Sequence, residues 1–268
     1  MWVLESAATF DLPDSRVWVA GDWHGNTGWA RTLLPALRRI DPGVSTLLHA
    51  GDWSMEPGTV DLLARDTGIT RMLVTTGNHE PWDQIRPLLD AHPGEAIRVS
   101  DVVWILPRPA QFRMGGVSFV SLGGAASVDR LLRTEGLDWW PDERISDDHV
   151  EAALRMRADV MVTHEPPDGT PVREARKVLD TNPGGWPEET LRESAESRRR
   201  VDRVWNALKP GVLFHGHLHV YGNAVTEDGR RVVSLGRDVH VGNVHLLELP
   251  SLRTETIPMS VIRRHSYG

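Results

Sequence analysis

The chain has 268 residues, of which 40% are hydrophobic and 25% charged, a balance that is typical of a globular protein and excludes a fibrous or largely disordered one. It contains no cysteine, which excludes disulfides, thiolate-bound zinc and a cysteine nucleophile. The formal net charge of −7 argues against a general electrostatic grip on nucleic acid, although it is compatible with a local basic groove. The segment 1–16 has neither a basic start nor a long apolar stretch, which predicts no signal peptide, no membrane anchor and a cytoplasmic location.

Short apolar runs recur along the chain, and each is followed directly by a glycine or a histidine. They cover residues 17–20, 46–50, 72–76 and 160–163. Because nearly every position in these runs is apolar, they predict strands that are buried on both faces of a sheet.

Helical patterns lie between these runs. Residues 29–40 carry large apolar side chains at helical spacing, and Asn26 could either support a site residue or cap this helix. We favour the cap, because asparagine is a preferred N-cap residue. Ser146 is the predicted N-cap of another helix that continues to Met156. The alternation of strands and helices predicts an α/β fold.

The second half of the chain adds antiparallel patterns. Residues 102–106, 111–114 and 117–122 are linked by turns rich in proline and glycine, and residues 232–235 and 244–249 predict a closing hairpin. Together these elements predict a two-sheet mixed β-sandwich flanked by helices, formed as a single domain over residues 1–268.

One stretch differs in composition from its surroundings. Residues 165–185 are rich in proline and glycine, and a charged helix-like segment follows at 188–208. We therefore expect a long loop and a lid-side helix inserted at about 165–208, rather than a linker between domains.

Seven side chains that can bind metal ions follow the apolar runs in a fixed order: Asp22, His24, Asp52, Asn78, His164, His217 and His219. Asp22 and His24 are two residues apart, so on an extended chain both project to one side. Asp52 offers two oxygens, enough to bridge two cations that lie ~3.5–4 Å apart. A mixed set of histidine, carboxylate and amide suits Mn, Fe or Zn better than Mg or Ca alone. The positions just after strand ends are where open α/β sheets hold their active sites.

No single residue of this set is sufficient to predict a metal site. Taken alone, His24 or His164 would be interpreted as a structural histidine, and only the complete set favours metal ligands. His49 lies inside an apolar run and His215 directly follows one, and both are predicted to be partly buried strand histidines. Glu80 is predicted to fix a loop or a neighbouring imidazole.

The ordered blocks Asp-x-His, Gly-Asp, Gly-Asn-His-Glu, His and Gly-His-x-His, spread from residue 17 to about 220, resemble those of the calcineurin-like metallophosphoesterase superfamily. The resemblance implies a four-layer fold and the hydrolysis of a phosphodiester or phosphomonoester by attack of a metal-bridging hydroxide. It implies two divalent transition-metal ions, Mn, Fe or Zn, one on Asp22, His24 and His219 and the other on Asn78, His164 and His217, with Asp52 as the bridge. His79 matches the histidine that serves as general acid.

The substrate is less closely defined than the reaction. The block Gly51-Asp52-Trp53-Ser54 lacks the Val-Asp-Arg-Gly continuation of the protein Ser/Thr phosphatase branch, which disfavours that branch. We expect a small phosphate ester, with a nucleotide or a short nucleic acid among the candidates, and no membrane partner. Arg130 and Arg133 follow Gly123-Gly124 at the end of a predicted strand, where a guanidinium could bind a phosphate through two hydrogen bonds, or they could lie on a solvated helix face. Arg130 is the predicted substrate-binding arginine, ahead of Arg133.

Two other functions are compatible with the same motifs. A catalytically inactive binding scaffold could keep this fold, and a structural-metal protein could keep the ligands without turnover. An inactive relative should lack a ligand or the acid, whereas here every ligand position and His79 are filled. The sequence therefore favours an enzyme.

Overall fold

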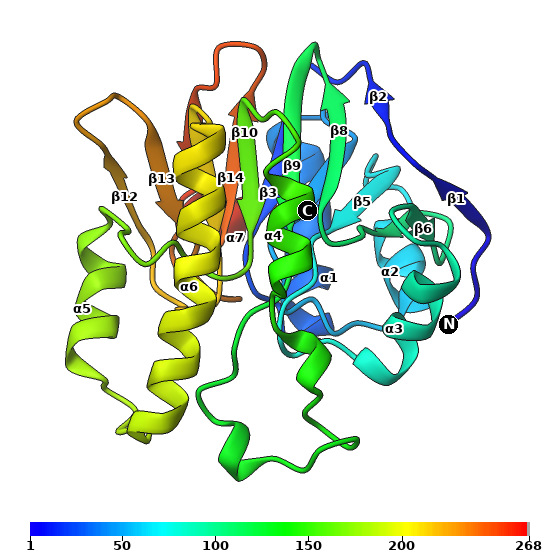
Figure 1. Ribbon diagram of the computed structural model, residues 1–268. Helices are drawn as coiled ribbons and strands as arrows, with labels where there is room; N and C mark the ends of the chain where they lie inside the picture. Colours follow the sequence, from blue (N-terminus) through cyan, green and yellow to red (C-terminus); the bar gives the residue numbers. More distant parts are fainter. Residues whose placement is uncertain (267–268) are drawn as a thin grey trace.

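The computed structural model describes residues 1–266, and within them the chain forms two mixed β-sheets (Figure 1). One sheet has eight strands in the order β1 (Glu5–Ala7), β6 (Ala96–Arg98), β7 (Val103–Ile105), β5 (Arg71–Val74), β4 (Thr46–His49), β3 (Arg16–Ala20), β14 (Val244–Glu248) and β15 (Thr254–Thr256). The other has seven in the order β12 (Gly222–Val225), β13 (Arg231–Ser234), β11 (Val212–His215), β10 (Val160–Thr163), β9 (Val117–Leu122), β8 (Ala110–Met114) and β2 (Asp11–Leu12).

Each sheet has a parallel centre. Strands β3, β4, β5 and β7 run parallel to one another in the first sheet, and β9, β10, β11 and β13 do so in the second. Because parallel strands end at the same edge, the loops that follow β3, β4 and β5 meet there, as do those that follow β10 and β11. The predicted ligands are in these loops.

The strands are apolar on both faces because each sheet is covered on both sides. In β3, Val17 and Val19 pack between the two sheets, while Trp18 packs against helices. The helices are α1 (Thr27–Ile40), α2 (Pro57–Ala64), α3 (Trp82–Ala91) and α7 (Met259–Ser266) on the first sheet, and α4 (Asp147–Ala153), α5 (Arg173–Thr181) and α6 (Glu188–Leu208) on the second. Two short 3₁₀ turns, η1 (Arg130–Leu132) and η2 (Pro141–Glu143), lie in the green segment that extends beyond the strand ends in Figure 1. The predicted two-sheet mixed sandwich flanked by helices is confirmed.

The helix starts agree with the predicted caps. The Asn26 side chain accepts a hydrogen bond from the Trp29 backbone N at 2.9 Å, so it caps α1. The Ser146 hydroxyl accepts from the His149 backbone N at 3.2 Å and caps α4. The latter helix ends at Ala153, three residues before the predicted end.

The predicted closing hairpin is wrong. Strand β13 pairs in parallel with β11, and β14 pairs antiparallel with β3, so the loop between them crosses from one sheet to the other. In the same way β7 joins β5 in the first sheet, whereas only β8 and β9 form the predicted antiparallel pair. Short apolar runs predict strands but do not specify the partner, because either sheet can bury them.

The segment predicted as a long loop contains a helix. Helix α5 occupies Arg173–Thr181, and Ala175 is its buried residue. Its apolar residues, Ala175, Val178 and Leu179, cover little more than one helical turn, so the prolines and glycines around it dominated the prediction. The single-domain boundaries and a lid role for residues 165–208 stay predictions. No helix among residues 1–266 has the length and apolar character needed to cross a membrane.

Replacement of Phe119 by alanine tests the packing between the sheets. The Phe119 ring is fully buried and stacks on Phe112, with ring centroids 5.1 Å apart. Its loss leaves a cavity between two rigid sheets, so we expect the free energy of unfolding in urea to fall by about 3–5 kcal/mol. Leu62→Ala, at a side chain that is 63% exposed, is the control and should change it by less than about 0.5 kcal/mol. Equal effects of the two changes would contradict the assigned core.

Candidate metal centre

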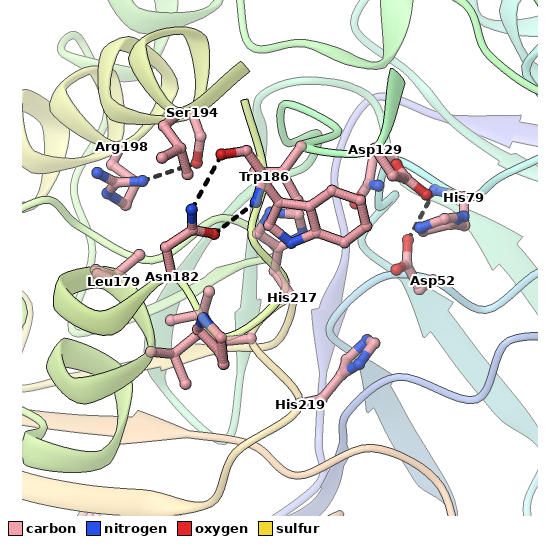
Figure 2. A pocket seen from close by; sticks show the side chains of 16 residues that line it. Asp52, His79, Asp129, Leu179, Asn182, Trp186, Ser194, Arg198, His217 and His219 are labelled. Atoms are coloured by element: carbon pink, nitrogen blue, oxygen red, sulfur yellow. Dashed lines mark hydrogen bonds between the residues drawn. The ribbon is translucent and has the colours of Figure 1, made fainter. Parts of the chain in front are cut away.

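The seven predicted ligands lie in loops at the carboxyl ends of five strands, three from the first sheet and two from the second. Asp22 and His24 follow β3, Asp52 follows β4, Asn78 follows β5, His164 follows β10, and His217 and His219 follow β11. The site therefore spans the edge of both sheets. Figure 2 shows His79 and Asp52 on one side of a cleft, residues of α5 and α6 on the other, and His217 and His219 between them.

Four of these side chains form one compact group. The potential ligand atoms of Asp22, His24, Asp52 and His219 all lie within 4.8 Å of one another. His219 Nε2 is 3.1 Å from Asp22 Oδ2, and His24 Nε2 is 3.3 Å from Asp52 Oδ2. Ligands that share an ion at ~2.0–2.2 Å are separated by comparable distances, so this group can hold a metal ion.

The other predicted ligands adjoin this group through Asp52. His164 Nε2 lies 3.0 Å from Asn78 Oδ1 and 3.3 Å from Asp52 Oδ2, and the His217 ring centroid is 5.0 Å from that of His164. Asp52 Oδ2 is thus close to imidazole nitrogens on both sides. This buried oxygen has no hydrogen-bond partner within the described part of the chain, as expected of an atom that binds a cation.

The hydrogen bonds around these residues orient them for metal binding. His164 Nδ1 lies 2.8 Å from the Ala50 carbonyl, which can only accept, so Nδ1 donates and Nε2 faces the site. The Asn78 amide donates through Nδ2 to the Ser127 hydroxyl at 2.9 Å, which directs Oδ1 toward His164. Glu80 accepts hydrogen bonds from the backbone N of Trp53, Ser54 and Gly77, so its predicted role in fixing a loop is confirmed.

The backbone of the site contains left-handed residues and closely packed glycines. Four predicted ligands, His24, Asp52, His217 and His219, have φ between 47° and 69°. A Cβ added at Gly77 would lie 2.2 Å from Asp52 Oδ1, and one at Gly216 would lie 2.2 Å from Asp22 Oδ1. Left-handed non-glycine residues cost free energy and gather at functional sites.

The charges in this cluster depend on one another. Burial raises the pKa of Asp52, but the neighbouring His164 and His24 outweigh it and hold that pKa well below its usual value. Burial lowers the pKa of His164, yet the charge of Asp52, whose Oδ2 lies 3.3 Å from Nε2, outweighs burial and raises that pKa to about 10. The buried carboxylates thus stabilise a protonated imidazole beside them, and they would stabilise a divalent cation for the same reason. Burial and the charge of His164 lower the pKa of His217 well below its usual value, which favours the neutral imidazole that binds metals.

Two histidines lie in strands as predicted, but they are fully rather than partly buried. His49 in β4 and His215 in β11 are fully buried. Burial lowers the pKa of His49 to about 3 and that of His215 to about 4. Both are therefore neutral side chains packed beneath the site.

His79 is held next to the cluster by its backbone and by an arginine. Its backbone N donates to Asp52 Oδ1 at 2.8 Å, and its ring centroid is 5.6 Å from that of His24. The Arg133 guanidinium contacts the His79 ring with Nη2 2.7 Å from Nε2, and it also pairs with Asp129 at 3.0 Å. The sequence favours Arg130 over Arg133 as the substrate-binding arginine and does not predict this contact.

Arg130 faces another set of partners. Its guanidinium pairs with Glu189 and with Glu193 Oε2 at 2.6 Å, both in α6. A substrate-binding role for Arg130 stays a prediction, and it would require these ion pairs to exchange for phosphate.

Two buried acids near the site were not singled out in the sequence. Glu165 directly follows His164, and its Oε1 is 3.7 Å from His217 Nε2. Glu143 Oε1 accepts hydrogen bonds from the Ser127 backbone N and from Trp139 Nε1, both at 2.9 Å. Because Ser127 holds the Asn78 amide, Glu143 supports a predicted ligand through one intermediate. The position of Glu165 directly after His164 is a signal that the sequence offers. No sequence pattern indicates the contact of Glu143, because only the fold brings it to Ser127.

The pH dependence of stability tests the buried state of Glu143. Burial raises its pKa from 4.5 to about 7. Between these values the unfolded chain loses a proton that the folded chain keeps, so this group's contribution to stability falls as pH rises. Glu143→Gln cannot ionise, so its stability relative to wild type should rise from pH about 5 to pH about 8 by up to about 3 kcal/mol.

The measurement is urea unfolding of the metal-stripped proteins at both pH values. Glu227→Gln, at an exposed position, is the control and should show no such change. A difference between Glu143→Gln and wild type that is the same at both pH values would contradict the burial assigned to this carboxyl.

Solved structures with related folds include two that cover most of this chain. A dimetal phosphatase from Danio rerio has a TM-score of 0.55 at 12% identity, covering 92% of this chain and 99% of its own. The protein TT1561 of Thermus thermophilus has a TM-score of 0.51 at 11% identity, covering 91% of this chain and 99% of its own. At such identities the similarity shows a shared fold. No curated protein matches the sequence significantly.

The family is shown by the sequence itself. The model of the calcineurin-like phosphoesterase family matches residues 15–221, a range that contains every predicted ligand, His79 and all five strands that carry them. The chain belongs to the calcineurin-like phosphoesterase family.

Proposed function

We propose that this protein is a dinuclear metal-dependent phosphoesterase that hydrolyses a phosphodiester or a phosphomonoester. The observation that carries the proposal is the position of Asp52 Oδ2, which lies 3.3 Å from both His24 Nε2 and His164 Nε2. One buried carboxylate oxygen between two groups of ligands is what a bridge between two cations requires.

The two ions would take separate ligand groups. Asp22, His24 and His219 would hold one, Asn78, His164 and His217 would hold the other, and Asp52 would be shared. Imidazole together with carboxylate and amide oxygens favours Mn, Fe or Zn. When bound, such ions neutralise phosphoryl oxygens and lower the pKa of a water molecule to about 7.

The protein side chains would orient the substrate and move a proton. His79 lies beside the cluster and would donate a proton from its ring to the leaving oxygen. Arg133 contacts that ring and would help to fix its orientation. We further propose a small phosphate ester as substrate, with a nucleotide or short nucleic acid among the candidates, and a cytoplasmic location.

The assay that tests the function uses protein stripped of metal and reloaded with Mn²⁺. It should hydrolyse bis(p-nitrophenyl) phosphate or p-nitrophenyl phosphate, measured side by side. Asp52→Asn should abolish hydrolysis and weaken the binding of both ions, because the shared ligand is lost. Asp66→Asn makes the same chemical change at an exposed position and should be unaffected.

Two results would count against the proposal. Loss of only one ion in Asp52→Asn would contradict the bridge. Full occupancy of both sites without hydrolysis of either compound would favour an inactive scaffold or a structural-metal protein instead.

Replacement of His79 by alanine tests the proton donor. A good leaving group needs little protonation, so the variant should lose activity mainly on esters with poor leaving groups, on the order of 10²–10⁴-fold. The measurement is kcat/KM for a p-nitrophenyl ester and for the corresponding alkyl ester, with metal content determined in parallel. His92→Ala, at a partly exposed position in a different loop, is the control. An equal loss on both esters would show that His79 is not the acid.

A further inference from the structure

A cleft of about 310 Å³ adjoins the candidate metal centre (Figure 2). One end is lined by predicted ligands, among them Asp52 and His217, and by His79. The other end is lined by α5, α6 and the loop between them. A phosphate bound at the ligands would thus direct its organic part into a defined space.

The wall formed by α5 and α6 is largely apolar. Val178 and Leu179 of α5, Leu191 of α6, and Pro183 and Trp186 of the loop between the helices line the cleft. Val178, Leu179, Trp186 and Leu191 are only partly buried. Apolar side chains that are left partly exposed around a hollow are typical of a ligand site.

Trp186 is held in place by its own loop. Asn182, in the left-handed conformation with φ 42°, ends α5. Its side chain accepts from the Trp186 backbone N at 2.9 Å and donates to the Trp186 carbonyl at 3.0 Å. The indole packs over Gly184, where an added Cβ would lie 2.3 Å from Nε1. Figure 2 shows the indole projecting into the cleft from this loop. A fixed aromatic surface can bind a ring at a low entropic cost.

Apart from Asp52 at the metal end, the charged side chains of Asp and Arg that line the cleft already have partners. Arg198 pairs with Asp168 at 3.0 Å and donates to the Ser194 hydroxyl at 2.7 Å. Asp129 pairs with Arg133 at 3.0 Å. A hydroxyl-rich group would have to compete for these partners, whereas a flat apolar ring needs none of them.

We propose that the α5–α6 cleft binds the organic part of the substrate, and that this part is a planar, largely apolar ring stacked on Trp186. This inference rests on the proposed function, because the phosphate is assigned to the metal centre. Aryl groups and nucleobases both present a planar face that can stack on an indole. The size of the cleft, near the lower end of the ~300–1,000 Å³ range of small-molecule sites, favours one ring system over a polymer.

The test measures binding rather than turnover, using phosphonates, which the enzyme cannot hydrolyse. Methylphosphonate and phenylphosphonate are titrated into the Mn²⁺-loaded protein by calorimetry. Both carry the same metal-binding group, and only the second carries a ring. We expect phenylphosphonate to bind about two- to tenfold more tightly, because only its ring can stack on Trp186.

Variants of Trp186 assign the gain to the cleft. Trp186→Ala should reduce the affinity for phenylphosphonate to about that for methylphosphonate and leave methylphosphonate binding unchanged. Trp186→Phe keeps a flat ring and should retain most of the difference. Trp2→Ala, at a tryptophan that is 85% exposed, is the matched control and should have no effect.

The possible outcomes separate the two proposals. Binding of both compounds with equal affinity would overturn the ring assignment and leave the proposed function intact. Binding of neither would overturn the proposed function together with this assignment. A Trp186→Ala variant that keeps the full difference would overturn the role of the cleft. A parallel titration with adenosine 5′-O-thiomonophosphate distinguishes the sources of the ring: tighter binding than phenylphosphonate supports a nucleobase, and weaker binding supports an aryl group.

Discussion

The burial of two carboxylates among histidines is the constraint on which the rest of the structure depends. Asp22 is 0% exposed and Asp52 is 1% exposed, and a buried anion is costly unless a positive charge lies beside it. Protonated imidazoles meet part of that need, as the raised pKa of His164 shows. Cations at the same place would meet it fully and would allow the histidines to bind as neutral ligands, as the hydrogen bond from His164 Nδ1 to the Ala50 carbonyl already favours for His164. The folded cluster is therefore most stable when positive charge, from protonated imidazoles or from bound cations, lies beside the two carboxylates.

The fold places these groups together at the cost of local strain. Parallel strands in two packed sheets end at a common edge, so residues far apart in sequence, such as Asp22 and His219, come within 3.1 Å. The turns that carry them need left-handed residues and glycines without room for a Cβ, as at Gly77 and Gly216. The rigid sandwich below supplies the packing that holds these turns. The two helices beside the cleft differ in burial, because α6 has six buried residues whereas in α5 only Ala175 is buried.

The sequence was sufficient for elements whose local pattern has a single solution. Doubly buried strands such as residues 160–163 and the Asn26 cap follow from local chemistry, and the structure has them there. The order of the candidate metal ligands is also a local pattern, and their assignment as ligands stays a prediction. Strand pairing was not accessible, because the apolar run in β14 fits either sheet and only the complete fold assigns it to the first. The contact of Arg133 with His79, the link from Glu143 through Ser127 to Asn78, and the position of Trp186 in the cleft join segments that are distant in the sequence. Such contacts have no local pattern from which to predict them.

The most direct test of this account is a crystal structure of the Mn²⁺-loaded protein with anomalous data that locate the ions. The account predicts two peaks ~3.5–4 Å apart, with an oxygen of Asp52 bound to both ions, Asp22 and His219 on one, and His164 and His217 on the other. A single ion, or two ions with Asp52 bound to only one of them, would contradict it.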